Sequence, residues 1–476
     1  MVFPIAGGTQ DTSYEVENSL RFEDGDNANL TFTPSSAVTS ERKTFTISWW
    51  VKRGNLGTTV FMWEMGGNDN ANERIIARFD SNNRLNVNDS STAFRIPNRL
   101  FRDPSAWYHI VVAFDTTDST ADNRVKVYVN GVQETSFLTS NNPGQNDTKG
   151  FSHNSEHTIG RTNIDNGSPF DGYMTEFHAV GGSQLDATAF GKFNENGVWI
   201  PKKYTGSHGT NGFYLEFKQT GTSQNSSGIG ADTSGNDNHF AVSNLAAIDV
   251  TTDTCTNNFC TLNPLTARTY PVLREGNLQQ HEHGTGNSAG VAATIMPING
   301  KWYAELYLES PSGGDYPFFG ITDTLNLNNK GDYGSKMAAG FEIDGATNNQ
   351  STTNFGTITN TNTGWPSFAD NDIVQFALDL DNRKLWIGRN GTYINSGNPA
   401  SGSNQQLSWT VSDNTSLILL GYDGSGGGGS TSKWNYGNPP FSISSGNADA
   451  NGYGNFEYAP PSGYYSICTK NLAEYG

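Results

Sequence analysis

The stretch DNRKLWIGRNGTYI, residues 381–394, is typical of a strand, a tight turn and a second strand. Its first half alternates and is rich in β-forming residues. Asn390-Gly391 is the dipeptide that a two-residue hairpin turn prefers, because both turn residues need a positive φ. The stretch DNRVKVYVNGVQET, residues 122–135, has the same design with Asn130-Gly131 at its turn. The chain is therefore expected to build the same central hairpin twice, as a structural element rather than a binding site.

The composition favours an all-β protein. Charged residues are 16% and hydrophobic residues 34% of the 476 residues, and glycine is abundant with 54 copies. Aromatic residues are 12%, which argues against disorder because disordered chains lack the large side chains that build a core. The length indicates two or three domains. No stretch has the spacing of a long amphipathic helix, and the best short helical candidate is LDATAFGKF, residues 185–193.

The charge balance limits the classes of partner. Lys and Arg number 29 against 47 Asp and Glu, so the net charge is −18 and the pI is about 4.8. Nucleic-acid binding is not expected, because attraction to phosphates needs clustered Lys and Arg. No run of 18 apolar residues is present, so no membrane insertion is expected. Residues 1–20 lack the basic start and the apolar run of a secretory signal, so export by that route is not expected either.

The distribution of strands and turns predicts four parts. Residues 1–17 form a leader, 18–185 a first β-rich block, 186–289 a connecting segment and 290–476 a second β-rich block. Short strands separated by Gly, Asn and Asp turns indicate sandwiches rather than a parallel sheet. The connecting segment carries aromatic residues that favour ordered packing over a solvated linker: Trp199, Tyr204, Phe213, Tyr214 and Phe217.

Both blocks resemble known folds. The first resembles the laminin-G-like, concanavalin A-type lectin and glucanase fold, through FTISWWVKR, WYHIVVAFDTTDSTADNRVKVYVNGVQ and IGRTNIDNGSPFDGYMTEFHAV. The second resembles a SPRY domain, through KWYAELYLE, FFGITD and DIVQFALDLDNRKLWIGRNG. The resemblance implies two tandem antiparallel β-sandwiches, a concanavalin A-like jelly roll followed by a SPRY-like sandwich.

The connecting text, from FGKFNENGVWIPKKY to TNNFCTLNPL, is similar to the linking region of bacteriophage structural proteins, often from marine phages, that carry this pair of domains. This resemblance implies a non-enzymatic virion component (a tail fibre, head fibre or decoration protein) that contributes to attachment to host-surface polysaccharide. Other virion proteins are the expected partners, the chain is expected to be oligomeric within the particle, and the leader is a candidate anchor. A glycan depolymerase and a cellular adhesin or peptide-binding scaffold are the alternatives.

One motif invites a catalytic interpretation. Glycosidases of the laminarinase type on the lectin-like sandwich use a strand motif whose carboxylates share one face, two of them acting as nucleophile and acid/base. In GFEIDGATN, residues 340–348, Glu342 and Asp344 match its first two positions, but Thr347 stands at the third. The second essential carboxylate is therefore missing, and no catalytic residue is predicted.

Metal and cofactor signals are weak. His281 and His283 flank Glu282, but no further framework of ligands supports a metal site. The acid-rich loops at residues 23–29 (EDGDNAN) and 66–73 (GGNDNANE) offer oxygen ligands of the kind Ca²⁺ takes. Asp and Asn turns are also what any sandwich uses at its ends. No cofactor is expected, and calcium stays open.

Aromatic residues in polar loops are the candidate ligand-binding residues. Trp365 and Phe368 lie in NTGWPSFADND, and Trp434 and Tyr436 lie in SKWNYGNPPF. Exposed rings of this kind can stack on sugars or partner proteins, and the alternative is that they close the end of a core. Three cysteines are too few for a disulfide scaffold, and Cys255 and Cys260 are expected to be free.

Overall fold

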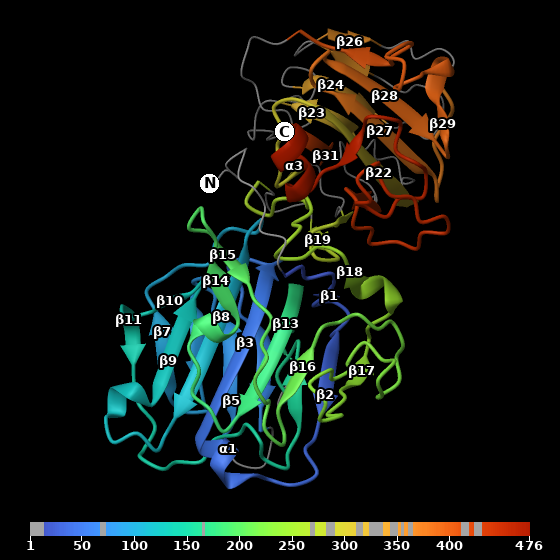
Figure 1. Cartoon of the computed structure of the whole chain (residues 1–476). Helices are drawn as coiled ribbons and strands as arrows, with labels where there is room; N and C mark the ends of the chain where they lie inside the picture. Colours follow the sequence, from blue (N-terminus) through green and yellow to red (C-terminus); the bar gives the residue numbers. More distant parts are fainter. Residues whose placement is uncertain are drawn as a thin grey trace. The chain divides into compact units, whose positions relative to one another are not determined.

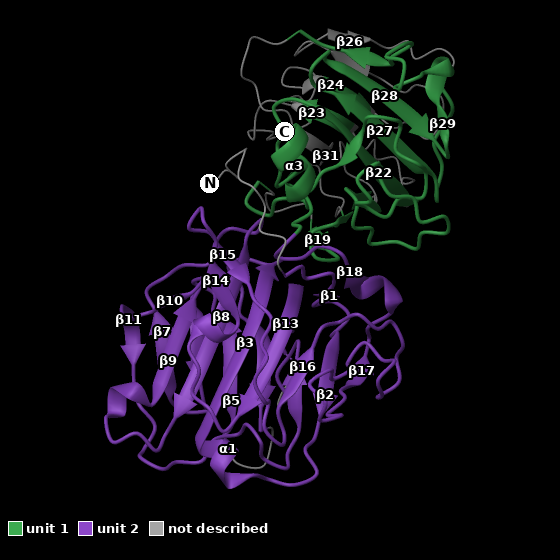
Figure 2. Ribbon diagram, viewed as in Figure 1, with its two compact units in different colours: residues 1–8, 257–476 green, residues 9–256 purple. Residues whose placement is uncertain are grey.

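Two sandwiches of mostly antiparallel strands make up the chain in the computed structural model (Figure 1). The structure describes residues 14–66, 73–163, 167–266, 272–281, 291–310, 318–322, 337–342, 351–353, 357–359, 365–410, 418–422 and 431–476. Two compact units, coloured separately in Figure 2, divide the chain between Thr256 and Asn257. Unit 2 holds the described residues up to Thr256 and unit 1 those from Asn257 onward. The expected all-β class is confirmed.

The first sheet of unit 2, named the β3 sheet, has the strand order β10-β9-β8-β3-β13-β1-β18, with β16 also paired to β13. Its strands are β1 (Ser19–Phe22), β3 (Thr44–Arg53), β8 (Trp107–Asp115), β9 (Val125–Val129), β10 (Val132–Gln133), β13 (Gly172–Gly181), β16 (Phe213–Leu215) and β18 (Val250–Thr251). The long strand β3 lies between β8 and β13, so it forms the centre of the sheet.

The second sheet of unit 2, named the β4 sheet, has the order β11-β7-β6-β5-β4-β12-β2-β17. Its strands are β2 (Asn29–Phe32), β4 (Val60–Met65), β5 (Ile75–Phe79), β6 (Leu85–Asn88), β7 (Ala93–Pro97), β11 (Phe137–Ser140), β12 (His157–Ile159) and β17 (Ala241–Ser243). A short helix, α1 (Thr39–Lys43), precedes β3.

Alternation along β3 sorts its side chains between two layers. Phe45, Ile47, Trp49 and Val51 are fully buried in the core between the two sheets. Trp50 points the other way, into a smaller cluster on the outer face of the β3 sheet. The period of two in TFTISWWVKR produces this division, because successive side chains of a strand point to opposite faces.

The outer face of the β3 sheet is covered by the segment that follows β13. Its Ala187, Phe190 and Trp199 pack on this face with Trp50 and Trp107. A two-stranded hairpin of β14 (Gly191–Phe193) and β15 (Trp199–Pro201) belongs to this cover. The prediction of a short helix at residues 185–193 is wrong. A 3₁₀ turn, Ala187–Ala189, stands there instead and is followed by β14, whose residues pair with β15.

Unit 1 has the same two-layer design. Its first sheet, named the β22 sheet, has the order β19-β20-β32-β22-β27-β28-β29, with β30 on β28 and β33 parallel to β22. Its strands are β19 (Val272–Arg274), β20 (Gln279–His281), β22 (Lys301–Ser310), β27 (Ile373–Asp379), β28 (Lys384–Arg389), β29 (Thr392–Tyr393), β30 (Leu407–Ser408), β32 (Thr431–Asn435) and β33 (Tyr465–Ser466).

The other sheet of unit 1 has the order β21-β31-β23-β24-β25-β26. Its strands are β21 (Val291–Ala292), β23 (Phe318–Thr322), β24 (Met337–Glu342), β25 (Ser351–Thr353), β26 (Thr357–Thr359) and β31 (Ile418–Tyr422). Trp302, Ala304, Leu306 and Leu308 of β22 lie in the core of the unit, as their alternation predicts. A helix, α3 (Thr469–Tyr475), ends the chain. No helix in the described ranges is both long and apolar enough to cross a membrane.

The two predicted hairpins are confirmed and share one device. At the turns, φ is +47° for Asn130 and +81° for Gly131, and +48° for Asn390 and +86° for Gly391. The Asn130 amide oxygen accepts a hydrogen bond from the backbone N–H of His109 at 2.8 Å, and that of Asn390 accepts one from Ile373 at 2.9 Å. In both units the Asn side chain therefore ties the hairpin turn to the strand before the hairpin, β8 in unit 2 and β27 in unit 1. This is a structural role.

The boundary between the units falls inside the expected connecting segment, residues 186–289. Strands β16, β17 and β18 pair with β13, β2 and β1, so the segment up to Thr256 completes unit 2. Strand β20 pairs with β32 and belongs to unit 1. The connecting segment was expected to pack in an ordered way through five aromatic residues. Four of these are buried: Trp199, Phe213, Tyr214 and Phe217.

Candidate functional site

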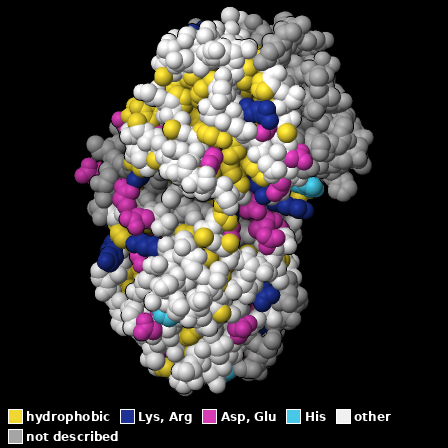
Figure 3. All heavy atoms as spheres, turned by 90° about the vertical axis from the view of Figure 1, so that its right-hand side faces the viewer, with side chains coloured by type: hydrophobic (Ala, Val, Ile, Leu, Met, Phe, Trp, Pro, Cys, Tyr) yellow, Lys and Arg dark blue, Asp and Glu magenta, His cyan; other side chains and the backbone are white. Residues whose placement is uncertain are grey.

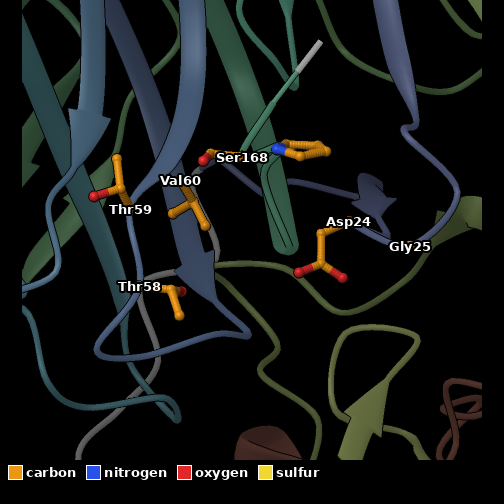
Figure 4. A pocket seen from close by; sticks show the side chains of 7 residues that line it. Asp24, Gly25, Thr58, Thr59, Val60 and Ser168 are labelled. Atoms are coloured by element: carbon orange, nitrogen blue, oxygen red, sulfur yellow. The ribbon is translucent and has the colours of Figure 1, made fainter. Parts of the chain in front are cut away.

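Three loops at one end of the first sandwich border an open hollow of about 400 Å³. Asp24 and Gly25 come from the β1–β2 loop, Thr58 and Thr59 from the β3–β4 loop, and Val60 from the start of β4 (Figure 4). Ser168 and Pro169 come from the segment before β13. Loops at the end of a rigid sandwich are a common place for binding residues, because the sheets fix the positions of the loops.

Arg53, the last residue of β3, holds the β3–β4 loop in place. Its guanidinium donates to the backbone oxygens of Asn55 at 2.9 Å and Phe101 at 2.6 Å, and to the side chain of Asn83 at 3.0 Å. The ring of Phe79 lies 4.4 Å below it. Burial lowers the pKa of Arg53 to about 10, so the group keeps its charge at neutral pH. A buried cation with this many acceptors makes the loop rigid.

Asp24 is tied to the same loop. Its Oδ2 accepts a hydrogen bond from the Asn55 side chain at 2.6 Å. Asn27, in the β1–β2 loop, and Ser168, in the lining of the hollow, have positive φ values of +57° and +53°. The Ser168 backbone oxygen accepts from the Phe61 N–H at 3.0 Å, which holds this conformation. Left-handed backbone at non-glycine residues is sparsely populated and gathers at functional sites.

The lining is chemically simple. Asp24 supplies a carboxylate that accepts hydrogen bonds, and Thr58, Thr59 and Ser168 supply hydroxyls that can donate or accept. Val60 and Pro169 supply the apolar surface. This mixture suits a small ligand rich in hydroxyl groups. Hydrolysis by paired carboxylates is not supported here, because Asp24 is the one acid among the seven lining residues.

The acid-rich loop at residues 23–29 is the one sequence candidate that the structure brings to this hollow. In this loop Glu23 accepts a hydrogen bond from the backbone N–H of Gly25, and Asp24 accepts one from the Asn55 side chain. Across the described ranges no group of three or more His, Cys, Asp or Glu side chains is arranged to hold a metal ion. Residues 67–72 of the other acid-rich loop lie outside the described residues.

The aromatic candidates lie in the core of unit 1, so the assumption that they are exposed is wrong. Phe368 is 3% exposed, and Trp434 and Tyr436 are completely buried. Trp434 and Tyr436 stack on each other with ring centroids 5.4 Å apart. Trp365 is half-buried against the same core. A ring without exposed surface has no face to offer to a sugar, which favours the alternative that these rings close a core.

The remaining candidates fall mostly outside the described residues. Asp344 and His283 are not described, and Glu342 ends β24. His281 lies in β20, where its Nδ1 is 2.8 Å from the Thr431 hydroxyl, a partner from the neighbouring strand. Cys255, Cys260 and Cys468 are free thiols, as expected for the first two.

A second polar cluster, which sequence reasoning missed, lies on the outer face of β13. Glu176 accepts from the hydroxyls of Tyr214 at 2.6 Å and Tyr14 at 2.7 Å. His178 Nδ1 lies 3.2 Å from His208 Nε2. Burial raises the pKa of Glu176. Hydrogen bonding and charge from His178, together with hydrogen bonds from the two phenols, lower it by more than burial raises it, so the net pKa is below its usual value. The pattern GYMTEFHAV contained the only hint, a Glu and a His two apart in an apolar strand.

One face of the molecule carries acidic and basic groups among many uncharged ones. On this face Figure 3 shows mostly uncharged polar side chains and backbone, an area of hydrophobic side chains, and acidic and basic groups interspersed. No broad basic area stands out on this face, which agrees with the net charge of −18.

Comparison with known proteins supports the lectin-like resemblance of the first sandwich. Residues 24–185 match the family model of the concanavalin A-like lectin/glucanases superfamily, laminin G type. The match covers every lining residue of the hollow, and the resemblance expected for this block is confirmed. No curated protein sequence matches the chain.

Solved structures show more distant similarity. The SPRY domain of human HERC1 is 17% identical, with a TM-score of 0.28, over 36% of this chain and 96% of that one. A heptameric SAP-like pentraxin of Limulus polyphemus is 17% identical, with a TM-score of 0.27, over 36% of this chain and 79% of that one. Domains LG4-5 of the mouse laminin α1 chain are 9% identical, with a TM-score of 0.28, over 90% and 89% of the two chains. These similarities are too distant to assign a function.

Proposed function

We propose that the chain is a non-enzymatic glycan-binding protein and that the hollow of the first sandwich holds the sugar. The observation that carries this proposal is that Asp24, Thr58, Thr59 and Ser168 line one open hollow. A carboxylate can accept hydrogen bonds from two neighbouring hydroxyls of a neutral sugar, and the Thr and Ser hydroxyls beside it can donate or accept.

The rigidity of the loops supports the same proposal. Arg53 and Asn55 hold the β3–β4 loop before any ligand arrives, so little conformational entropy is lost on binding. The match of residues 24–185 to a lectin and glucanase superfamily agrees with a sugar as ligand, although fold alone does not establish function.

Two charge-neutralising substitutions in the β1–β2 loop test whether the hollow is the binding site. Asp24→Asn keeps the size of the side chain and removes its charge, and Asp26→Asn in the same loop is the matched control because Asp26 is exposed and does not line the hollow. A glycan array identifies a neutral ligand, and calorimetry then compares the variants. We expect Asp24→Asn to weaken binding at least tenfold and Asp26→Asn to leave it within twofold. Equal loss in both variants, or none in either, would refute the hollow as the site.

One alternative, a depolymerase, has a direct readout. A depolymerase would shorten the polysaccharide ligand, so its size distribution after incubation with the protein decides between binding and cleavage. We expect no shortening, because the hollow offers one carboxylate where hydrolysis needs two.

We further propose that this binding serves attachment of a bacteriophage particle, with other virion proteins as partners. The support is the resemblance of the connecting text to phage structural proteins. Immunogold electron microscopy of the particle fraction tests the proposal. Gold at the tail would favour a fibre, gold over the head a decoration protein, and unlabelled particles would refute a place in the virion.

A further inference from the structure

Asn-Gly pairs occur at seven places in the chain, and one pair differs from the others in its contacts. The pairs begin at Asn130, Asn166, Asn196, Asn211, Asn299, Asn390 and Asn451. All except Asn166 lie in the described residues. An Asn-Gly pair is chemically labile, because the backbone nitrogen of the glycine can attack the carbonyl carbon (Cγ) of the Asn side chain and glycine has no side chain to hinder it. Since the pairs share this sequence, their contacts in the fold set their relative rates.

Two kinds of contact oppose the attack. The glycine nitrogen must turn toward Cγ, so an acceptor that binds its N–H holds it back. An acceptor that binds the Asn amide nitrogen holds back the other reacting group. Each of these hydrogen bonds must break before the two groups can meet, and each therefore slows the reaction.

Five of the six described pairs have such contacts. In four of them an acceptor binds the glycine N–H: the Asn194 backbone oxygen binds Gly197 at 3.0 Å, the Asp381 side chain binds Gly300 at 2.9 Å, the Gln375 side chain binds Gly391 at 2.7 Å and the Asp449 backbone oxygen binds Gly452 at 3.0 Å. In the fifth pair Asn211 is 4% exposed. Its amide donates to the Ser36 backbone oxygen at 2.8 Å and to the Ser152 hydroxyl at 2.7 Å.

Asn130-Gly131 is the exception. Within the part of the chain that the structure describes, neither the Gly131 N–H nor the Asn130 amide nitrogen donates to a protein acceptor. The side-chain oxygen of Asn130 is engaged, and it accepts from the His109 N–H. A donor on this oxygen stabilises the negative charge that an attack on Cγ places there. Asn130 and Gly131 are both partly exposed, so water reaches the pair.

The equivalent turn of unit 1 shows which side chains protect a pair. The Asp372 carboxylate accepts from the Asn390 amide at 2.7 Å, and Gln375 accepts from the Gly391 N–H at 2.7 Å. These two acceptors stand one residue before and two residues after Ile373, whose N–H donates to the Asn390 oxygen. Both groups that would react are therefore held.

Unit 2 has no acceptor for the turn at either position. His109 takes the place of Ile373, because its N–H donates to the Asn130 oxygen in the same way. Tyr108 therefore stands where unit 1 has its aspartate, and Val111 stands where unit 1 has its glutamine. The Tyr108 hydroxyl accepts from a backbone N–H of another loop, and a valine side chain offers no acceptor.

We propose that Asn130 is a site of spontaneous deamidation in the native protein and that their contacts protect the other five described pairs. The Gly131 nitrogen bonds to Cγ of Asn130, and its proton passes through water to the amide, which leaves Cγ as ammonia. Water then adds to one of the two carbonyl carbons of the cyclic imide and breaks its bond to the ring nitrogen. The product is aspartate or isoaspartate, with water as the only co-reactant and no change in oxidation state.

The modification alters the support of the β14–β15 hairpin. Trp199 of this hairpin packs against Gly131, where an added Cβ would overlap the indole. The indole N–H donates to His109 Nδ1 at 3.0 Å. Because an indole only donates, His109 keeps its proton on Nε2 and donates to the Ser48 hydroxyl 2.9 Å away. Deamidation puts a carboxylate on the turn beside this neutral histidine, and isoaspartate also adds a methylene to the backbone of the turn.

The experiment incubates the native full-length protein in heavy-oxygen water at mildly alkaline pH and maps its peptides by mass spectrometry. The oxygen that replaces the amide comes from water, so the label marks each Asn that reacts during the incubation. In urea-unfolded protein the six rates should lie within a few-fold of each other, because the contacts are gone. In the native protein we expect Asn130 to react at least tenfold faster than Asn196, Asn211, Asn299, Asn390 and Asn451.

Gln375→Met tests a protective contact directly. It keeps the length of the side chain and removes the acceptor at the turn of unit 1. We expect the rate at Asn390 to rise at least threefold and the rate at Asn130 to stay unchanged. Gln405→Met, at an exposed position of the same unit, is the matched control and should change neither rate. Asn451 should stay slow in both variants, which shows that unit 1 remains folded.

Three results would overturn the proposal. The first is a native rate at Asn130 that is no higher than the rates of the five pairs with held groups. The second is the fastest reaction at Asn196 or Asn390, which are more exposed than Asn130; exposure, and not hydrogen bonding, would then set the order. The third is an unchanged rate at Asn390 in Gln375→Met, which would show that this contact does not protect the pair.

Discussion

Tyr214 donates its hydroxyl to Glu176 at 2.6 Å, from β16 to the neighbouring strand β13. The pairing of β13 with β3 shifts register between Thr175 and His178, and Glu176 stands in this bulge with φ of +50°. Tyr14 donates to the other carboxylate oxygen at 2.7 Å. Two phenols therefore hold a buried carboxylate in a strained backbone position, and their hydrogen bonds favour its charged form.

Replacing this carboxylate tests the cluster. Glu176→Gln keeps the shape and the strained φ but turns one oxygen into an amide that cannot accept a phenol hydrogen. We expect unit 2 to lose about 3 kcal/mol of unfolding free energy, since hydrogen bonds to a charged group contribute about 1.5–3 kcal/mol each. The pKa of Glu176 is lowered in the fold, so its stabilisation is present above the usual carboxyl pKa and is lost as the pH falls. Urea unfolding at pH 7 and pH 4 measures both effects, and a variant that is as stable as the wild type at pH 7 would contradict them.

His109 supplies the second prediction. Burial, with a smaller effect from His178, lowers its pKa from 6.5 to about 3. Below pH 6.5 the His109 imidazole is protonated in the unfolded chain but stays neutral in the folded chain. The free energy of unfolding therefore falls by about 1.4 kcal/mol for each pH unit down to about pH 3. His109→Gln can accept from Trp199 and donate to Ser48 without titrating. We expect the wild type to lose about 2 kcal/mol more than this variant between pH 7 and pH 5, as measured by urea unfolding. Parallel losses in the two proteins would show that His109 takes up its proton normally.

Gly131 supplies the third prediction. Gly131→Ala places a Cβ against the Trp199 ring at a φ of +81°. We expect a loss of about 3 kcal/mol, the sum of left-handed strain and overlap with the indole. Gly182→Ala is the matched control, because Gly182 has a φ of +80° with nothing within 4 Å of an added Cβ, and it should cost about 1 kcal/mol. Thermal unfolding measures both, and equal losses would show that the close approach of Trp199 is unimportant.

The sequence predicts the strands that form the two cores well. Strict alternation in β3 and β22 divided their side chains correctly, because a period of two needs no knowledge of the neighbouring strands. The bulge at Glu176 could not be predicted in this way. It arises from the register of β13 against β3, and these strands are far apart in the chain.

The candidate site shows the same limit. The Asp24 loop was recognisable from its acidic residues, but Thr58 and Ser168 come from distant loops that have no marked composition. The aromatic candidates were misjudged for another reason. Asn435 and Asn438, the polar neighbours of Trp434 and Tyr436, are themselves buried, so a polar context did not indicate exposure.

Glu305 supplies the last prediction, for unit 1. It is fully buried on β22 and accepts from the Tyr303 hydroxyl at 3.0 Å, from the backbone N–H groups of Tyr458 at 2.8 Å and Glu457 at 3.0 Å, and from the Asn435 amide at 3.2 Å. Glu305→Gln points an amide N–H₂ at two of these donors, so we expect unit 1 to lose about 3 kcal/mol. Burial raises the pKa of Glu305, so the wild type also loses stability as the pH rises from its usual value through the folded pKa, and the variant does not.

Calorimetry of the full-length chain checks this prediction, because the two compact units offer separate transitions to follow. Glu309→Gln is the control on the same strand. Glu309 is 40% exposed and pairs with Lys433 at 2.8 Å, and an exposed pair of this kind contributes at most about 1 kcal/mol. We expect Glu305→Gln to lower only the transition that Glu176→Gln leaves in place. If both variants lowered the same transition, the two buried carboxylates would belong to a single cooperative unit, and the division of the chain at residues 256 and 257 would not describe how it unfolds.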